Sequence, residues 1–154
     1  MKKILIVDDE NLKSEQIKSF LSRTIKHVEF DTAMALNEGL LKAIRNKYDL
    51  ILLDMSLPIF DKEESSNFNS YGGIDFLKEM KRKRSNKPVL VITQYELLGE
   101  GLYQRTAHSI DEECKNTFDN YNGMIIYSSI DNSWEKDLYE KVRIIIDDKG
   151  FDCG

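Results

Sequence analysis

Cysteine is scarce in this sequence, and long apolar runs are missing altogether. The 154 residues include two cysteines, Cys114 and Cys153, which lie far apart and outside any metal-ligand spacing. We therefore expect free thiols in a reducing cytoplasm and no disulfide framework. The apolar run Ile4–Val7 is four residues long and ends in three acids, which excludes a secretory signal there. Nothing elsewhere approaches the roughly 20 apolar residues of a membrane span, so no membrane contact is expected.

An excess of positive charge is also lacking. The net charge is -5 and 32% of the residues are charged, which argues against nucleic acid as the main partner. One basic cluster, Lys81–Arg84 followed by Lys87, has the charge to contact phosphates. Cations in a last helical turn also complement the helix dipole and are usually just solvated, and we favour that interpretation.

The length is that of one domain with a proper core. The sequence has no internal repeat and no low-complexity linker. We therefore expect a single domain over residues 1–150 and a short C-terminal tail at 151–154. Because no output domain follows residue 154, the domain is expected to act as a stand-alone protein.

Short apolar runs alternate with helical patterns along the chain. Four of the runs lack two-residue alternation, which is typical of strands buried on both faces of a parallel sheet. The expected strands are Lys3–Val7, a weaker Val28–Thr32, Leu50–Leu53, Pro88–Thr93 and Met124–Tyr127. Helices are expected over Asn11–Lys26, around Leu36–Ile44, after Gly72–Gly73 and from Ser133 to about Gly150. This pattern predicts an α/β fold, a flavodoxin-like doubly wound five-stranded parallel sheet of order 2-1-3-4-5 with helices on both faces.

The first of these helices is expected to be amphipathic. Ile17, Phe20, Leu21 and Ile25 fall on one face, and Lys, Ser and Gln side chains fall opposite them. We therefore expect the apolar residues of this helix to cover the sheet and its lysines to face away from it.

Two connections are longer than such a fold needs. Residues Ile59–Tyr71 are mostly polar and lack periodicity, which predicts a loop. Residues 94–123 exceed the length of one helix with its two loops, so an extra helical segment is expected there. We predict two short helices, Glu96–Gln104 and Ser109–Phe118, and a turn at Asn122–Gly123 before the last strand.

Three carboxylates follow two of the predicted strands. Asp8 and Asp9 come after the first strand and Asp54 after the third, and these strands are neighbours in the order 2-1-3-4-5. Crowded carboxylates repel one another unless a hard cation lies among them, and Mg²⁺ prefers such oxygen ligands. The carbonyl of Ser56 is a further candidate ligand. Thr93 ends the fourth strand, where its hydroxyl can bond an oxyanion attached to Asp54, since a carboxylate can act as a nucleophile toward phosphoryl groups.

These residues together resemble the receiver domain of two-component response regulators. The resemblance rests on Asp8–Asp9, Asp54 with Pro58 four residues later, Gly72–Gly73 and Thr93, and it covers nearly the whole chain apart from two insertions. It implies that Asp8 and Asp9 organise Mg²⁺, that Asp54 is the phosphoacceptor and that Thr93 is the switch hydroxyl. It also implies a histidine kinase or phosphotransfer protein as phosphoryl donor, a downstream protein partner, and a slowly autodephosphorylating phosphoacceptor rather than an enzyme.

Two departures from this family lie at the predicted site. Receivers usually carry a lysine at the end of the fifth strand, and Tyr127 stands in its place. Gln94 follows Thr93 where the family prefers a small residue. Because a tyrosine brings no positive charge, we expect slow phosphorylation, or else a cation from the long segment, Arg105 or Lys115, that replaces the lysine.

Two hypotheses of different classes remain open. The intact Asp8, Asp9, Asp54 and Thr93 favour a phosphoacceptor that works with Mg²⁺ in a phosphorelay. The unusual Gln94 and Tyr127 favour a pseudo-receiver, in which the fold serves as a phosphorylation-independent interaction module. A Mg²⁺-dependent phosphatase of small molecules is disfavoured, because no general acid and no substrate pocket can be named.

Overall fold

A computed structural model describes residues 1–57, 72–94, 97–98 and 105–150. The five-stranded parallel sheet has the order β2-β1-β3-β4-β7. Its strands are β1 (Lys2–Val7), β2 (Val28–Ala33), β3 (Leu50–Leu53), β4 (Val89–Thr93) and β7 (Tyr121–Ile126). The helices are α1 (Asn11–Thr24), α2 (Leu36–Arg45), α3 (Gly72–Arg82), α4 (Ala107–Thr117) and α5 (Ser133–Gly150).

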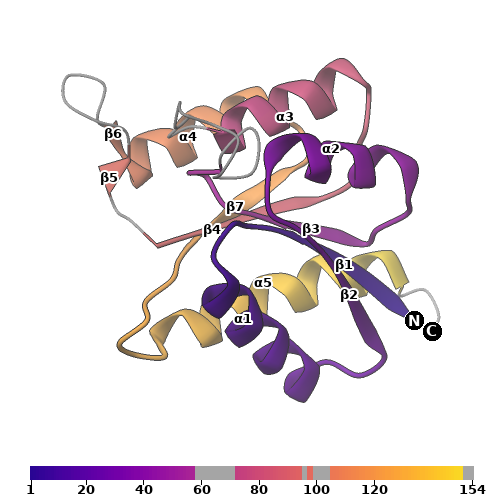
Figure 1. Cartoon of the computed structure of the whole chain (residues 1–154), viewed down its shortest axis with the longest axis vertical. Helices are drawn as coiled ribbons and strands as arrows, with labels where there is room; N and C mark the ends of the chain where they lie inside the picture. The colour runs from indigo at the N-terminus through magenta and orange to yellow at the C-terminus, as the bar shows by residue number, and fades with distance from the viewer. Residues whose placement is uncertain (58–71, 95–96, 99–104, 151–154) are drawn as a thin grey trace.

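Helices cover both faces of the sheet (Figure 1). On one face lie α2, α3 and α4, and on the other lie α1 and α5. Successive residues of a strand point to opposite faces, so each central strand contributes to two separate cores. Leu53 and Val91 belong to the core under α2, α3 and α4, whereas Leu52 and Ile92 belong to the core under α1 and α5. The apolar runs are continuous because both faces are buried.

The predicted fold is confirmed, because the five parallel strands follow the order 2-1-3-4-5 when they are counted along the chain. The predicted helix Ser109–Phe118 corresponds to α4, which begins at Ala107 and ends at Thr117. The predicted loop Ile59–Tyr71 and the tail 151–154 lie outside the described residues.

The predicted helix Glu96–Gln104 is wrong where it can be checked. Strand β5 (Leu97–Leu98) pairs with strand β6 (Arg105–Thr106) in a two-stranded antiparallel sheet. Gly99 and Gly101 lie between these strands in the sequence, and glycine costs about 1 kcal/mol per residue in a helix interior. Among the described residues between β4 and β7, the element in addition to α4 is therefore this strand pair.

The last strand begins earlier than predicted. Asn122 and Gly123 were expected to form a turn, but both belong to β7. Gly123 has a φ angle of 117°, which only glycine adopts readily. The glycine therefore serves an unusual strand conformation rather than a chain reversal.

No helix in the described ranges has the length and apolar character needed to cross a lipid bilayer.

Candidate phosphoacceptor site

The register of the central strands places two carboxylates side by side. Val7 of β1 is paired with Leu53 of β3, and the next residues along these strands are Asp8 and Asp54. The backbone continues this pairing, since the Asp54 amide donates to the Val7 carbonyl at 3.0 Å. Because both strands run in the same direction, their carboxyl ends meet at one edge of the sheet, where open α/β sheets bind ligands.

Asp9 completes a group of three carboxylates. One oxygen of each of Asp8, Asp9 and Asp54 lies within 4.8 Å of the others. Asp8 and Asp54 are buried, with 4% and 6% of their surface exposed, whereas Asp9 is half-buried. An all-oxygen set of this kind suits Mg²⁺, which binds through a few carboxylates and keeps several waters.

Burial makes the ionised form of Asp8 costly. Desolvation raises the pKa of Asp8 from 3.8 to about 7; the Lys13 ammonium opposes this shift, and the neighbouring Asp54 adds to it. A buried carboxylate with a raised pKa has unmet demand for positive charge. The residues present therefore fit a divalent cation, on the chemistry of the donors and on the electrostatics of Asp8.

Lys13 lies within this group of carboxylates, although the sequence predicts it on the exposed face of its helix. Lys13, the third residue of α1, is 2% exposed. Its Nζ lies 2.7 Å from Asp8 Oδ2 and 3.4 Å from Asp54 Oδ1. Burial lowers the pKa of Lys13, but the negative charges of Asp54 and Asp8 leave it above its usual value. Ser14 is also buried, so the expectation that the polar residues of this helix face away from the sheet is wrong at its first turn.

The remaining predicted residues follow β3 and β4. Thr93 ends β4, is fully buried, and its Oγ1 has no hydrogen-bond partner among the described residues. Gln94 follows it and is half-buried. Ser56 lies in the turn that begins directly after Asp54 and is half-buried. An unpaired buried hydroxyl is costly, so Thr93 is a group for which a ligand oxygen would be a favourable partner.

Tyr127 contributes a ring rather than a hydroxyl to the site. Its amide donates to the Thr93 carbonyl at 2.8 Å, which places it directly after β7 and beside the end of β4. The ring centroid lies 5.9 Å from Lys13 Nζ, a cation–π arrangement. The Tyr127 hydroxyl donates to Gln16 Oε1 on α1. The hydroxyl is thereby engaged with α1, and the tyrosine brings no positive charge to the site.

Neither expected substitute for the lysine can be placed at the site. Lys115 lies on α4, is 53% exposed at its side chain, and pairs with Asp111 at 3.2 Å and Glu112 at 3.8 Å. Its ammonium is therefore committed to neighbours on its own helix. Arg105 belongs to β6, but its side chain lies outside what the structure describes.

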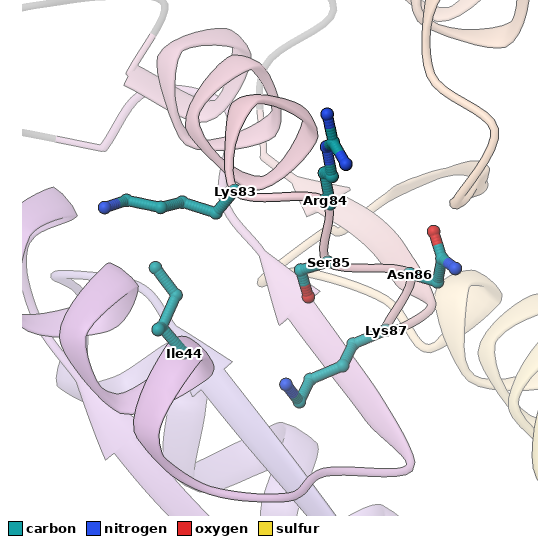
Figure 2. A pocket seen from close by; sticks show the side chains of 6 residues that line it. All are labelled: Ile44, Lys83, Arg84, Ser85, Asn86 and Lys87. Atoms are coloured by element: carbon teal, nitrogen blue, oxygen red, sulfur yellow. The ribbon is translucent and has the colours of Figure 1, made fainter.

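The basic cluster of the sequence surrounds a hollow of about 480 Å³ between α2 and the connection from α3 to β4, shown in Figure 2. Lys83, Arg84 and Lys87 line it together with Ile44, and the Lys83 and Arg84 side chains point in different directions. Nearby, Arg82 pairs with Glu79 at 2.7 Å. Cations that diverge do not form a built anion site, which agrees with the interpretation of this cluster as solvated charge at the end of a helix.

Comparison with known proteins assigns the family. Residues 4–102 match the model of the response regulator receiver domain. The chain belongs to the response regulator receiver family of two-component systems. Members of this family are signalling modules that interact with histidine kinases or phosphotransfer proteins.

Several known proteins are similar to this chain over nearly its whole length. The Detocs response regulatory protein DtcB of Enterobacter cloacae is 24% identical over 147 residues, which cover 91% of this chain and 97% of DtcB. The Francisella response regulator 1452 receiver domain has a TM-score of 0.67 at 21% identity, covering 97% of this chain and all of that one. The response regulator TrrA of Thermotoga maritima, solved in complex with Mg²⁺-BeF, has a TM-score of 0.63 at 26% identity, covering 94% and 99%.

Proposed function

We propose that this receiver accepts a phosphoryl group on Asp54 and signals through protein contacts that depend on that modification. The observation that carries the proposal is the group of three carboxylates at the ends of β1 and β3. The unpaired Thr93 hydroxyl at the end of the neighbouring strand supports it. A simple structural salt bridge would need neither the third carboxylate nor a buried hydroxyl without a partner.

The reaction that fits this arrangement is transfer from a phosphohistidine of a histidine kinase or phosphotransfer protein. A carboxylate oxygen of Asp54 attacks the phosphorus, a P–O bond forms and the P–N bond of the donor breaks. The electron pair of the broken bond stays on the imidazole nitrogen, which then takes up a proton, and Asp54 becomes an acyl phosphate. Carboxylate nucleophiles of this kind form aspartyl phosphates in other proteins.

Each neighbouring residue has a defined part in this proposal. Asp8, Asp9, Asp54 and the Ser56 carbonyl would hold Mg²⁺, which neutralises charge on the transferring group when it is bound. Thr93 Oγ1 would donate to a phosphoryl oxygen once one is present, which would satisfy the hydroxyl. The movement needed for that bond would be passed to the segment after Thr93, with Gln94 as its first residue, and so to a partner surface.

The central test is covalent labelling. Incubation of the protein with acetyl phosphate and Mg²⁺ is expected to add the mass of one phosphoryl group, because acetate can leave with the electron pair of the broken P–O bond. Asp54→Asn should remove the label, since the amide is not a nucleophile of this kind. Intact-mass spectrometry measures both results, and Asp119→Asn, at an exposed aspartate, is the matched control that should label normally.

Two outcomes would contradict the phosphoacceptor proposal. A label that persists in Asp54→Asn would place the chemistry elsewhere. An unlabelled wild type, with acetyl phosphate and with a cognate kinase alike, would favour the alternative, a pseudo-receiver that binds its partner without phosphorylation. In such a pseudo-receiver, the Lys13 ammonium would permanently neutralise Asp8 and Asp54 in place of a metal ion.

A second prediction concerns the metal. Millimolar Mg²⁺ is expected to raise the melting temperature of the wild type, because a ligand that binds only the folded state stabilises it by mass action. At ten times its Kd the gain is about 1.4 kcal/mol, or roughly 3–6 °C for a chain of this size. Asp9→Ala should abolish the shift in a thermal melt and Asp119→Ala should keep it. Equal shifts in both variants would argue against a shared site.

A further inference from the structure

Lys13 is in a place where a lysine is unfavourable without a specific reason. It lies in the first turn of α1, where the helix dipole disfavours a cation. It is also 2% exposed, and a buried ammonium is costly unless it is paired and hydrogen-bonded. The other buried residues of this helix include Ile17, Phe20 and Leu21. An apolar side chain at position 13 would continue that face without any electrostatic cost.

The ammonium has one partner from each of three neighbouring strands. It lies 2.7 Å from Asp8 Oδ2, after β1, and 3.4 Å from Asp54 Oδ1, after β3. It also donates to the carbonyl of Ile92 in β4 at 2.7 Å. Asp8 Oδ2 has no directed hydrogen bond among the described residues, so the ion pair with Lys13 is what compensates it. The ammonium therefore lies at the carboxyl ends of the three central strands. The carbonyl that it contacts in β4 belongs to the residue directly before Thr93.

The residue that follows the last strand accommodates this lysine. The Tyr127 ring lies against the ammonium and packs on Trp134 of α5, with ring centroids 5.1 Å apart. Its hydroxyl is bound by Gln16 of α1, one helical turn beyond Lys13. A lysine at position 127 would place a second ammonium in a space that already holds one. The tyrosine and Lys13 therefore form one arrangement in which α1 contributes the charge and the last strand contributes the ring.

We propose that Lys13 supplies, from helix α1, the positive charge that binds the phosphoryl group on Asp54. This inference rests on the proposed phosphoacceptor function. The ammonium is already 3.4 Å from the Asp54 oxygen Oδ1, so oxygens of a phosphoryl group attached to Asp54 are within its reach. Charge-assisted hydrogen bonds from an ammonium to a phosphate are among the strong ones. In this proposal Lys13 of α1 takes the role of the lysine that receivers usually carry after the last strand of the sheet, and Tyr127 occupies that lysine's usual position.

The hydrogen bond from Lys13 to the Ile92 carbonyl links the lysine to strand β4. When the ammonium turns toward phosphoryl oxygens, its bond to the Ile92 carbonyl competes with the new one. Ile92 directly precedes Thr93, the residue whose hydroxyl would also be drawn toward the phosphoryl group. Both changes act on the same end of β4, so Lys13 would help to couple the charge on Asp54 to that strand.

The test combines Lys13→Met with Tyr127→Lys in the full chain. The readouts are the labelling rate with acetyl phosphate and Mg²⁺, and the melting-temperature shift caused by beryllofluoride with Mg²⁺, a non-covalent phosphoryl analogue. We expect Lys13→Met to lower the labelling rate by tenfold or more and to lose most of the beryllofluoride shift. Tyr127→Lys in the Lys13→Met background should restore both. Lys18→Met, at a half-buried lysine further along α1, is the matched control.

The Tyr127→Lys single variant keeps the test decisive if Lys13→Met fails to fold. If Lys13 already supplies the charge, a second ammonium adds nothing to it, and Tyr127→Lys should raise the labelling rate by less than twofold. A rise of tenfold or more would mean that the wild-type site lacks a phosphate-binding cation, and the inference would be overturned. It would equally be overturned by a folded Lys13→Met that labels and binds beryllofluoride like the wild type. An unlabelled wild type is a different result, because it removes the phosphoacceptor function itself.

Discussion

Asp8→Asn is expected to stabilise the metal-free protein, on the order of a few kcal/mol at pH 8 and by less at pH 5. Burial raises the pKa of Asp8 from 3.8 to about 7 in the folded protein. Each unit of pKa corresponds to about 1.4 kcal/mol between the charged and neutral forms. Asparagine resembles the neutral form in size and polarity, so it avoids the cost of holding a buried carboxylate ionised.

The dependence on pH follows from which state binds the proton. Between pH 3.8 and about 7 the folded protein keeps a proton on Asp8 that the unfolded chain has released. Wild-type stability from this group is therefore fully present below pH 3.8 and is lost as the pH rises to about 7. The Asp8→Asn variant lacks this loss, so the difference between the two proteins widens over the same window.

Urea unfolding in EDTA at pH 5 and pH 8 measures this difference. Asp119→Asn, at an exposed carboxylate, controls for the change in net charge and should show no such widening. A variant less stable than the wild type at pH 8 would mean that the ion pair of Asp8 with Lys13 at 2.7 Å outweighs the burial. That result would mean that Asp8 stabilises the fold through its ion pair with Lys13 and has no need of a further cation.

The fold could be predicted from sequence because burial on both faces of a sheet leaves a strong pattern. Leu50–Leu53 is fully buried and has no polar position, and the same is true of Ile4–Val7. Prediction failed where glycine has several roles. Gly99 and Gly101 fall inside the predicted helix Glu96–Gln104, whereas the described residues Leu97–Leu98 and Arg105–Thr106 pair as β5 and β6. Gly123 was treated as part of a turn, whereas it is a strand residue of positive φ.

The carboxylates of the site could also be predicted, because strand order alone brings Asp8 and Asp54 together. Lys13 was missed for a different reason. Lysine is almost never fully buried unless it is paired, so it was assigned to the exposed face together with its polar neighbours. The spacing nonetheless contained the signal, since Lys13 lies four residues before Ile17 and thus on the buried face. A lysine at a core position of a helix that follows two aspartates indicates an internal ion pair.

Gly72→Ala is expected to destabilise the protein by about 3 kcal/mol or more, because overpacking that moves backbone exceeds the usual cost of a misfitted methyl group. A Cβ at position 72 would lie 1.9 Å from the Leu57 carbonyl oxygen, a backbone atom. At the next position, the Gly73 amide donates to the Met55 carbonyl at 2.9 Å. The start of α3 is therefore packed directly on residues 55–57, which follow Asp54.

Thermal unfolding should show a decrease in melting temperature of roughly 6–12 °C for Gly72→Ala. Lys78→Ala, at an exposed position of the same helix, should change it little and controls for helix propensity. The site should be affected together with stability, because displacement of residues 55–57 moves the turn that begins at the Asp54 carboxylate and carries the Ser56 carbonyl. Wild-type stability in Gly72→Ala would mean that the 55–57 turn yields easily. The glycine would then be dispensable for the close approach of α3 to the site.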